Sequence, residues 1–196
     1  MALRVLGIDP GLTRCGVGVV DVAPDRTATL VAVEVIRTSP DQALEERLLD
    51  IGAGIERLLD EHRPQAVALE RVFAQQNLRT VMGVAQASGV ALLVAARRGL
   101  AVGLHTPTEV KAALTGFGGA DKKQLGNMVA RILRLEAVPK PADASDALAL
   151  AICHAWRGSP AGPAGPAADA LTPAQEAWRA AERSAGRTGG DRRLGA

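Results

Sequence analysis

RVLGIDPGLTRCGVGVVD, residues 4–21, consists of two runs of apolar and small residues separated by a Pro-Gly turn. The runs predict two strands, residues 3–9 and 15–22, joined as an antiparallel hairpin. The first run ends on a carboxylate, Asp9. Burying a carboxylate at the end of a strand is costly unless a cation or hydrogen bonds compensate it. This stretch therefore predicts the first two strands of a sheet and raises the question of what compensates Asp9.

Three more strands and two long helices follow the hairpin. Apolar runs predict strands over 28–36, 66–70 and 100–105. Leucine and isoleucine at helical spacing predict a helix over 41–62, and a second long helix covers 78–98. A meander followed by helix, strand, helix, strand predicts an α/β fold: a mixed five-stranded sheet, antiparallel meander plus parallel strands, with helices on both faces.

The end of the chain changes in composition. A last structured helix is predicted over 142–156, and we expect residues 1–156 to form one domain. The tail, 157–196, is rich in Pro, Gly and Ala and is expected to be disordered, with a marginal helix over 173–185.

Composition excludes several classes of protein. The 196 residues contain neither a long apolar run nor a secretory signal pattern, so we expect a cytoplasmic protein without a membrane span. Cys15 and Cys153 lie in apolar stretches far apart, without a CxxC motif. We expect buried free thiols rather than zinc ligands.

Positive charge gathers in one segment. Residues 1–96 carry 9 basic and 12 acidic residues, net −3, whereas 97–140 carry 8 and 3, net +5. A basic segment beside acidic ones favours a phosphate-rich partner, held against a site that itself holds cations. A solvated surface of mixed charge is the alternative.

Four carboxylates occupy positions that suggest a metal site. Asp9 and Glu70 end predicted strands, at the sheet edge where ligands usually bind. Asp143 and Asp146 are three residues apart and share one helix face. If that helix begins against the strand ends, the four acids converge and cannot all stay ionised without a cation. Oxygen ligands favour Mg²⁺ or Mn²⁺, and two such ions suit an in-line phosphoryl displacement.

Some of these acids have a simpler interpretation when taken alone. The helix dipole favours an acid such as Asp143 in a first turn. Glu70 can form a surface ion pair with Arg71 or Arg79. The metal site therefore depends on the four acids taken together.

Four longer motifs follow one another along the chain: GIDPGLTRCGVGVVD, LERVFAQQN, TPTEVKAALTGFGGADKKQ and ADASDALALAICH. In order and spacing they resemble the motifs of the RuvC family, the bacterial Holliday junction resolvases of the RNase H-like superfamily. The resemblance covers residues 3–156. It implies that Asp9, Glu70, Asp143 and Asp146 are the catalytic, metal-binding acids. Some members have histidine in place of Asp143, so this chain has the all-carboxylate version.

The resemblance also implies an activity and partners. It implies a homodimer that cuts two opposing strands of a four-way DNA junction symmetrically, in homologous recombination and DNA repair. The nicks carry 5′-phosphate and 3′-hydroxyl ends. We expect Mg²⁺ as cofactor, two ions per subunit, with Mn²⁺ able to substitute. Family members work with the RuvA and RuvB branch-migration proteins.

Basic residues in the third motif are candidate DNA contacts. Capping boxes predict helices that start after Thr106 and Asp121. Lys111 lies in the first turns of one helix, and Lys122 with Lys123 opens the other, where backbone amides favour an anion. By resemblance, Lys111 and Lys122 match residues that contact DNA near the cut, and Lys123 is our addition. Solvated helix-end lysines are the alternative.

Aromatic residues make up only 2% of the chain, so Phe73 is conspicuous. It lies three residues after Glu70, in the loop that follows the strand. It can stack on an unpaired base at the junction centre, the role that a phenylalanine has in the family, or it can anchor the loop by packing. Phe117, between glycines, is expected to pack.

The helix over 78–98 has no acid in NLRTVMGVAQASGVALLVAARRG and is small or apolar around most of its circumference. One face covers the sheet, so the rest requires another partner surface. We predict an isologous homodimer through this helix, with Gly83 and Ala87 allowing close approach. The alternative is that loops of the same domain cover the helix.

Other functions fit parts of the pattern. A sugar-kinase or actin-like ATPase also has an Asp-x-Gly turn, but it needs a second domain for which 196 residues leave no room. A ribosomal-RNA-processing nuclease shares the fold, and the TPTEVK and ADKKQ helices favour the resolvase by resemblance. A junction-binding scaffold without catalysis does not need four retained acids.

Overall fold

The computed structural model describes residues 1–71 and 78–157. Phe73 and the predicted tail lie outside the described residues, apart from Arg157, which ends the last helix. The strands are β1 (Leu3–Asp9), β2 (Arg14–Val22), β3 (Ala28–Arg37), β4 (Ala66–Glu70) and β5 (Ala101–His105). The helices are α1 (Leu44–His62), α2 (Leu78–Arg97), α3 (Pro107–Thr115), α4 (Lys122–Ile132) and α5 (Ala142–Arg157).

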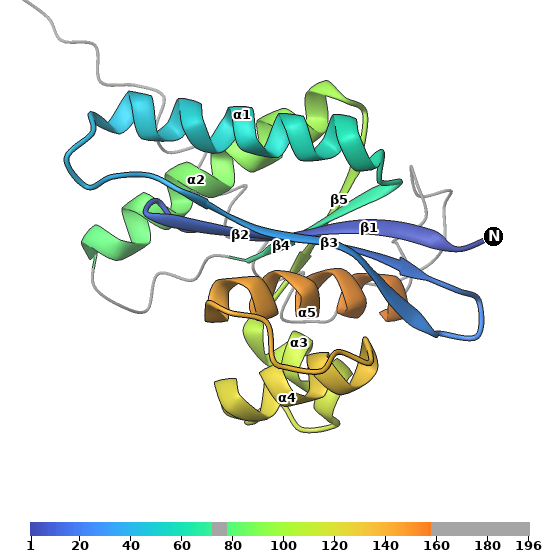
Figure 1. The fold of residues 1–196 in the computed structure, drawn as a ribbon. Helices are drawn as coiled ribbons and strands as arrows, with labels where there is room; N and C mark the ends of the chain where they lie inside the picture. Colours follow the sequence, from blue (N-terminus) through green and yellow to red (C-terminus); the bar gives the residue numbers. More distant parts are fainter. Residues whose placement is uncertain (72–77, 158–196) are drawn as a thin grey trace, which may run out of the picture. The chain divides into compact units, whose positions relative to one another are not determined.

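The strands form one mixed sheet in the order β3-β2-β1-β4-β5 (Figure 1). β1, β2 and β3 are antiparallel neighbours, whereas β4 runs parallel to β1 and β5 runs parallel to β4. The predicted five-stranded sheet is therefore confirmed. Ile8 pairs with Leu69, so Asp9 and Glu70 end adjacent parallel strands at the same edge of the sheet.

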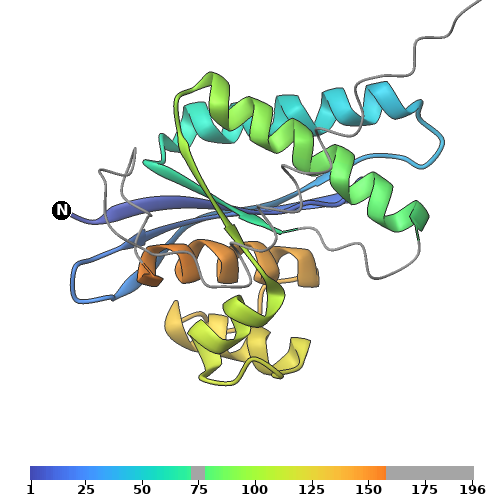
Figure 2. The ribbon, with the colours of Figure 1, turned by 180° about the vertical axis from the view of Figure 1, so that it is seen from behind.

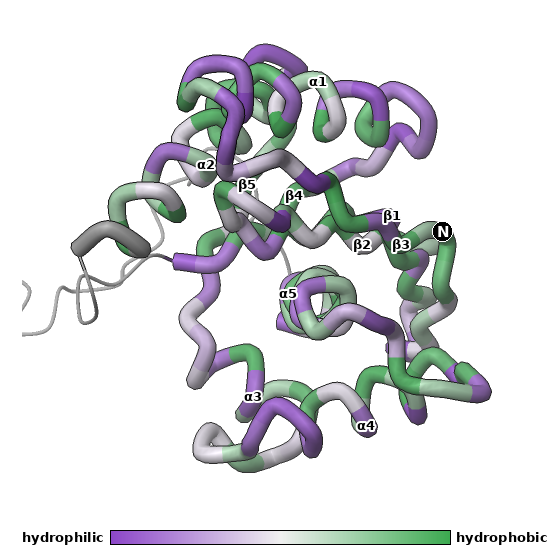
Figure 3. Tube along the Cα trace, turned by 60° about the vertical axis from the view of Figure 1, so that its left-hand side comes forward, coloured by the Kyte–Doolittle hydropathy of each residue, from purple (hydrophilic) through white to green (hydrophobic). Residues whose placement is uncertain are grey.

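Helices cover both faces of the sheet (Figures 1 and 2). α1 and α2 pack on one face, and α5 packs on the other between the sheet and the pair α3 and α4 (Figure 3). Cys15 lies in the core under α1 and Cys153 in the core around α5, and both thiols are buried and free, as predicted. None of the described helices is long and apolar enough to cross a membrane.

The first long helix starts later than its hydrophobic spacing predicts. We expected it from residue 41, but α1 begins at Leu44. A local turn competes with the helix: the Gln42 amide donates to the Ser39 carbonyl oxygen, and the Ser39 amide donates to the Gln42 side chain. Ser39 and Gln42 thus satisfy each other's backbone outside the helix, as polar side chains before a helix often do.

The capping boxes that the sequence predicts are both present. The Thr106 hydroxyl accepts a hydrogen bond from the Glu109 amide, and the Glu109 carboxylate accepts one from the Thr106 amide. Asp121 and Gln124 form the same reciprocal pair at the start of α4. These caps position the first turns of α3 and α4, where the predicted lysines lie.

Two glycines allow α5 to lie directly on the β1–β2 hairpin. A Cβ atom at Gly7 would overlap the Ala147 carbonyl oxygen, and one at Gly16 would overlap the Asp143 carbonyl oxygen. Both overlaps are with backbone atoms, which cannot rotate away. The absence of these two side chains therefore sets the height of α5 above the sheet, and with it the position of the acids in its first turns.

We expect Gly7→Ala to lower the free energy of unfolding by about 3 kcal/mol, because the new methyl group pushes α5 off the sheet. Urea unfolding measures this. Gly52→Ala in α1 is the control: there a Cβ would meet only one Val90 methyl group at 3.2 Å. The gain in helix propensity should keep that change within about 1 kcal/mol. Equal losses in the two variants would contradict this account of α5 packing.

Candidate active site

The carboxyl ends of β1 and β4 and the first turns of α5 open onto a hollow of about 850 Å³. All four predicted acids line it: Asp9 from β1, Glu70 from β4, and Asp143 and Asp146 from α5. The structure thus brings together side chains that lie more than 130 positions apart along the chain, from Asp9 to Asp146. The close packing of α5 on the hairpin is what makes this possible.

The carboxyl groups of Asp9 and Glu70 are close enough to affect each other's pKa. Burial, together with the negative charges of Glu70, Asp146 and Asp143, raises the pKa of Asp9 to about 8. Burial also raises the pKa of Glu70. Without a bound cation the pair therefore keeps a proton at neutral pH.

The two acids of α5 are compensated differently. The Arg14 guanidinium lies 2.9 Å from a carboxylate oxygen of Asp143, and the Lys122 ammonium lies 3.1 Å from one of Asp146. Asp146 is also the largest cause that raises the pKa of Lys122. Each α5 carboxylate therefore already holds a side-chain cation.

Among the residues that the structure describes, no group of three or more ligand-type side chains is gathered closely enough to hold an ion. The two acids of α5 are held by the cationic side chains of Arg14 and Lys122. The donor set itself fits Mg²⁺, because it consists of carboxylate oxygens on a strand end and a helix start. The raised pKa of Asp9 marks a place where a cation would relieve repulsion.

The proton on Asp9 predicts how the metal-free protein responds to pH. Asp9 loses its proton near pH 8 in the folded chain but near pH 4 when unfolded, so the folded state binds more protons between these values. This contribution to stability is complete below about pH 4 and is lost as pH rises toward 8, at up to about 1.4 kcal/mol per pH unit.

We expect Asp9→Asn to flatten that profile and to be more stable than the unmodified chain at pH 9 in EDTA. Urea unfolding at pH 5, 7 and 9 measures the difference. Excess Mg²⁺ should restore stability to the unmodified chain at pH 9 but not to the variant. If the two proteins have parallel pH profiles in EDTA, the pKa of Asp9 is not raised in the folded chain.

The other predicted contacts lie at different places. Lys111 lines a smaller adjoining hollow of about 170 Å³ together with Glu70, Asp146 and Lys122. Lys123 is exposed and lies in neither hollow. The predicted packing of Phe117 is wrong, because its side chain is 65% exposed at the end of α3.

The second long helix presents an apolar face to solvent. Met82 is 55% exposed and Leu93 52% exposed on α2, and Leu104 of β5 is 41% exposed. Gly83 and Ala87 do not contribute to that face: Gly83 packs near Leu12, and Ala87 is buried in the core. These two small residues therefore allow close packing of α2 inside its own chain, and not the close approach of a second copy that we predicted.

Sequence reasoning missed two arginines that line the acidic hollow, Arg14 and Arg47. Arg14 lies inside the hairpin motif, three residues after Gly11, and its position just beyond a turn at the sheet edge was a usable signal. Arg47 lies in α1, far from the motifs. Its helix pattern identifies a surface position but not which part of the surface it faces.

Comparisons with known proteins cover most of the chain. A family model described as crossover junction endodeoxyribonuclease RuvC matches residues 5–154. The crossover junction endodeoxyribonuclease RuvC of Leifsonia xyli subsp. xyli is 67% identical over 199 residues, which cover 96% of this chain and 96% of that protein. The protein of the same name from Clavibacter michiganensis subsp. michiganensis is 64% identical over 197 residues, 93% of this chain and 98% of that one.

Solved structures agree with these sequence matches. The T. thermophilus RuvC in complex with a Holliday junction substrate is 39% identical and superposes with a TM-score of 0.76, over 79% of this chain and 94% of that chain. The yeast mitochondrial Holliday junction resolvase Ydc2 is 14% identical with a TM-score of 0.57, a likeness of fold alone. By the family model, the close relatives and the shared fold, the chain belongs to the RuvC family of crossover junction endodeoxyribonucleases.

Proposed function

We propose that this crossover junction endodeoxyribonuclease resolves four-way DNA junctions by metal-dependent hydrolysis of two opposing strands, leaving 5′-phosphate and 3′-hydroxyl ends. The observation that carries the proposal is the hollow in which four carboxylates meet basic side chains. The T. thermophilus relative, solved with a Holliday junction substrate, supports the choice of DNA. We assign the nuclease chemistry to residues 1–156 and none of it to the tail, 157–196.

Asp9, Glu70, Asp143 and Asp146 are the residues that would hold two Mg²⁺ ions, or Mn²⁺ in their place. When bound, such ions lower the pKa of an attacking water and stabilise the charge on the attacking and leaving oxygens. The chain itself holds the four acids on strands and a helix that pack together, so that the acids keep their positions relative to one another. Asp9 would have to release its proton to act as a ligand.

Lys122 would be available to the substrate if Asp146 were held by a metal ion. Lys122 now pairs with Asp146, at 3.1 Å. If Asp146 held a metal ion instead, the ammonium group of Lys122 would be available to a DNA phosphate in the same hollow. Lys111 faces the adjoining hollow and is suited to the same strand. Lys123, which lies on the exposed side of α4, suits only an outer contact, and Phe73 is the candidate for stacking on a base.

The exposed apolar face of α2 supports a homodimer, in which two copies of the hollow would face the two strands to be cut. A face with several exposed large apolar side chains is typical of an interaction surface. An isologous interface through α2 would set the two sites at a constant separation. Family resemblance adds RuvA and RuvB as partners that would deliver the junction.

Incubation with a synthetic four-way junction, a linear duplex and a structured RNA tests the activity. In Mg²⁺ we expect paired, symmetric nicks on the junction and no comparable cleavage of the duplex or the RNA. A ligase should be able to seal the nicks in the duplex products. In Ca²⁺ we expect junction binding without cleavage. Equal cutting of the linear duplex would contradict junction resolution, and preferential cutting of the RNA would favour an RNA-processing nuclease.

A further inference from the structure

Three basic side chains line the acidic hollow among the described residues: Arg14, Arg47 and Lys122. Arg14 is paired with Asp143, and Lys122 is paired with Asp146. Arg47 has no carboxylate partner in the described part of the chain, although four carboxylates line the same hollow. Its positive charge is therefore the one in this set that no side chain neutralises.

Arg47 is nevertheless held in place, by hydroxyl groups. Its Nε donates to Thr38 Oγ1 at 2.9 Å, and its Nη2 donates to Thr13 Oγ1 at 2.8 Å. Thr38 is buried and donates in turn to the Leu12 carbonyl oxygen at 2.6 Å. The network connects α1, the end of β3 and the β1–β2 turn. It orients the guanidinium at the rim of the hollow without cancelling its charge.

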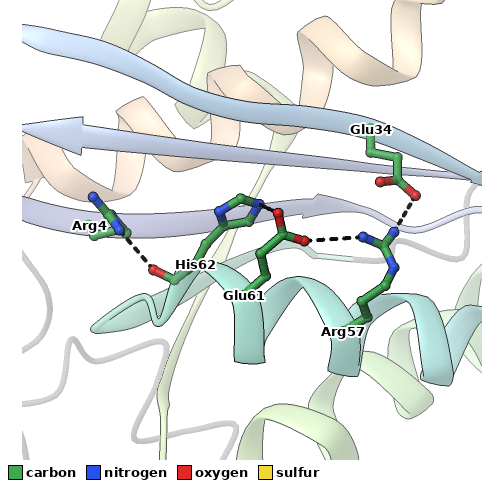
Figure 4. Close-up of polar contacts among 5 residues, drawn as sticks. All are labelled: Arg4, Glu34, Arg57, Glu61 and His62. Carbon is green, nitrogen blue, oxygen red and sulfur yellow. Dashed lines mark hydrogen bonds and ion pairs between the residues drawn. The ribbon is translucent and has the colours of Figure 1, made fainter.

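Arg57, ten residues further along the same helix, shows the ordinary alternative (Figure 4). Its guanidinium lies 2.6 Å from Glu34 and 3.4 Å from Glu61, so two carboxylates neutralise it. Arg57 is a surface ion-pair residue outside the hollow. The two arginines lie on the same helix but differ in their acceptors: Arg47 donates to hydroxyl groups, and Arg57 donates to carboxylates.

We propose that Arg47, oriented by Thr13 and Thr38, is a phosphate-binding residue that holds the DNA backbone on the α1 side of the hollow. A planar guanidinium with donors left over suits phosphate oxygens, and its orientation before binding lowers the entropy lost on contact. Lys122 and Lys111 lie on the α3 and α4 side of the site. With Arg47 opposite them, basic groups flank the acids on both sides, so a strand that crosses the hollow is held before and after the position of the cut.

This inference rests on the proposed function, since it concerns how the junction is held. The test is equilibrium binding of a synthetic four-way junction by the full chain in Ca²⁺, at several salt concentrations. Arg47→Gln should weaken binding about 10-fold and reduce the slope of log affinity against log salt by about one per subunit, since one phosphate contact is lost. Arg57→Gln, the matched control, should change neither.

Arg47→Lys separates charge from orientation. We expect it to keep the salt slope of the unmodified chain while losing about 3-fold in affinity, since the charge remains but the double anchoring is lost. Thermal unfolding of each variant reports folding separately. If Arg47→Gln lowers only the melting temperature and leaves the salt slope unchanged, Arg47 is structural and the inference is wrong. If the unmodified chain does not bind the junction, the proposed function fails and this inference with it.

Discussion

Asp9→Asn should abolish junction cleavage, by roughly 10³-fold or more, while junction binding in Ca²⁺ stays within about 3-fold of the unmodified chain. Asp9 is the acid at the centre of the site: Glu70, Asp143 and Asp146 all affect its pKa. An amide has nearly the same shape but no charge, so it weakens a metal site without opening a cavity. The measurement is single-turnover cleavage of a labelled four-way junction in Mg²⁺, beside binding in Ca²⁺.

Asp21→Asn is the matched control for that experiment. Asp21 lies on β2, outside the hollow, and accepts two hydrogen bonds of 2.7 Å from Arg4. Its replacement should cost some stability and leave cleavage intact, because Asp21 contacts no part of the site. Loss of both cleavage and binding in Asp9→Asn, with the fold unchanged, would mean that Asp9 supports the DNA-binding surface rather than a metal ion.

Leu93→Glu should convert a homodimer into monomers at micromolar concentration and remove paired cleavage of the junction. Leu93 lies on the exposed apolar face of α2, where a glutamate is harmless in water but costs about 3 kcal/mol or more when buried without a partner at an interface. That cost corresponds to a dimer at least about 100-fold weaker. Sedimentation velocity measures the mass, and the cleavage pattern shows whether both strands are still cut together.

Leu49→Glu is the control for the dimer variant. Leu49 lies on α1 and is 70% exposed, so a charge there removes a similar apolar group from a different face. We expect this variant to remain dimeric and to cut both strands. A Leu93→Glu protein that sediments as the unmodified chain does, or an unmodified chain that is itself monomeric, would contradict the interface through α2.

Much of the architecture could be read from local patterns. Apolar runs predicted all five strands, and the capping residues Thr106 and Asp121 predicted the starts of α3 and α4. These features depend on neighbours a few residues apart, which is why they can be predicted. The start of α1 was predicted too early, because the side chains of Ser39 and Gln42 form a competing turn that hydrophobic spacing does not report.

The sequence by itself determined which acids are candidates for the site, since strand ends and helix starts are local properties and Asp9, Glu70, Asp143 and Asp146 stand at them. Only the tertiary structure decided how the acids are compensated: a raised pKa for Asp9, and side-chain cations for the acids of α5. It also decided that the Arg47 guanidinium, at the same hollow, is held by hydroxyl groups and not by a carboxylate. Such pairings depend on long-range packing. The lack of a Cβ atom at Gly16, for example, sets how closely α5 can approach the sheet, and the spacing of residues along the chain does not encode that distance.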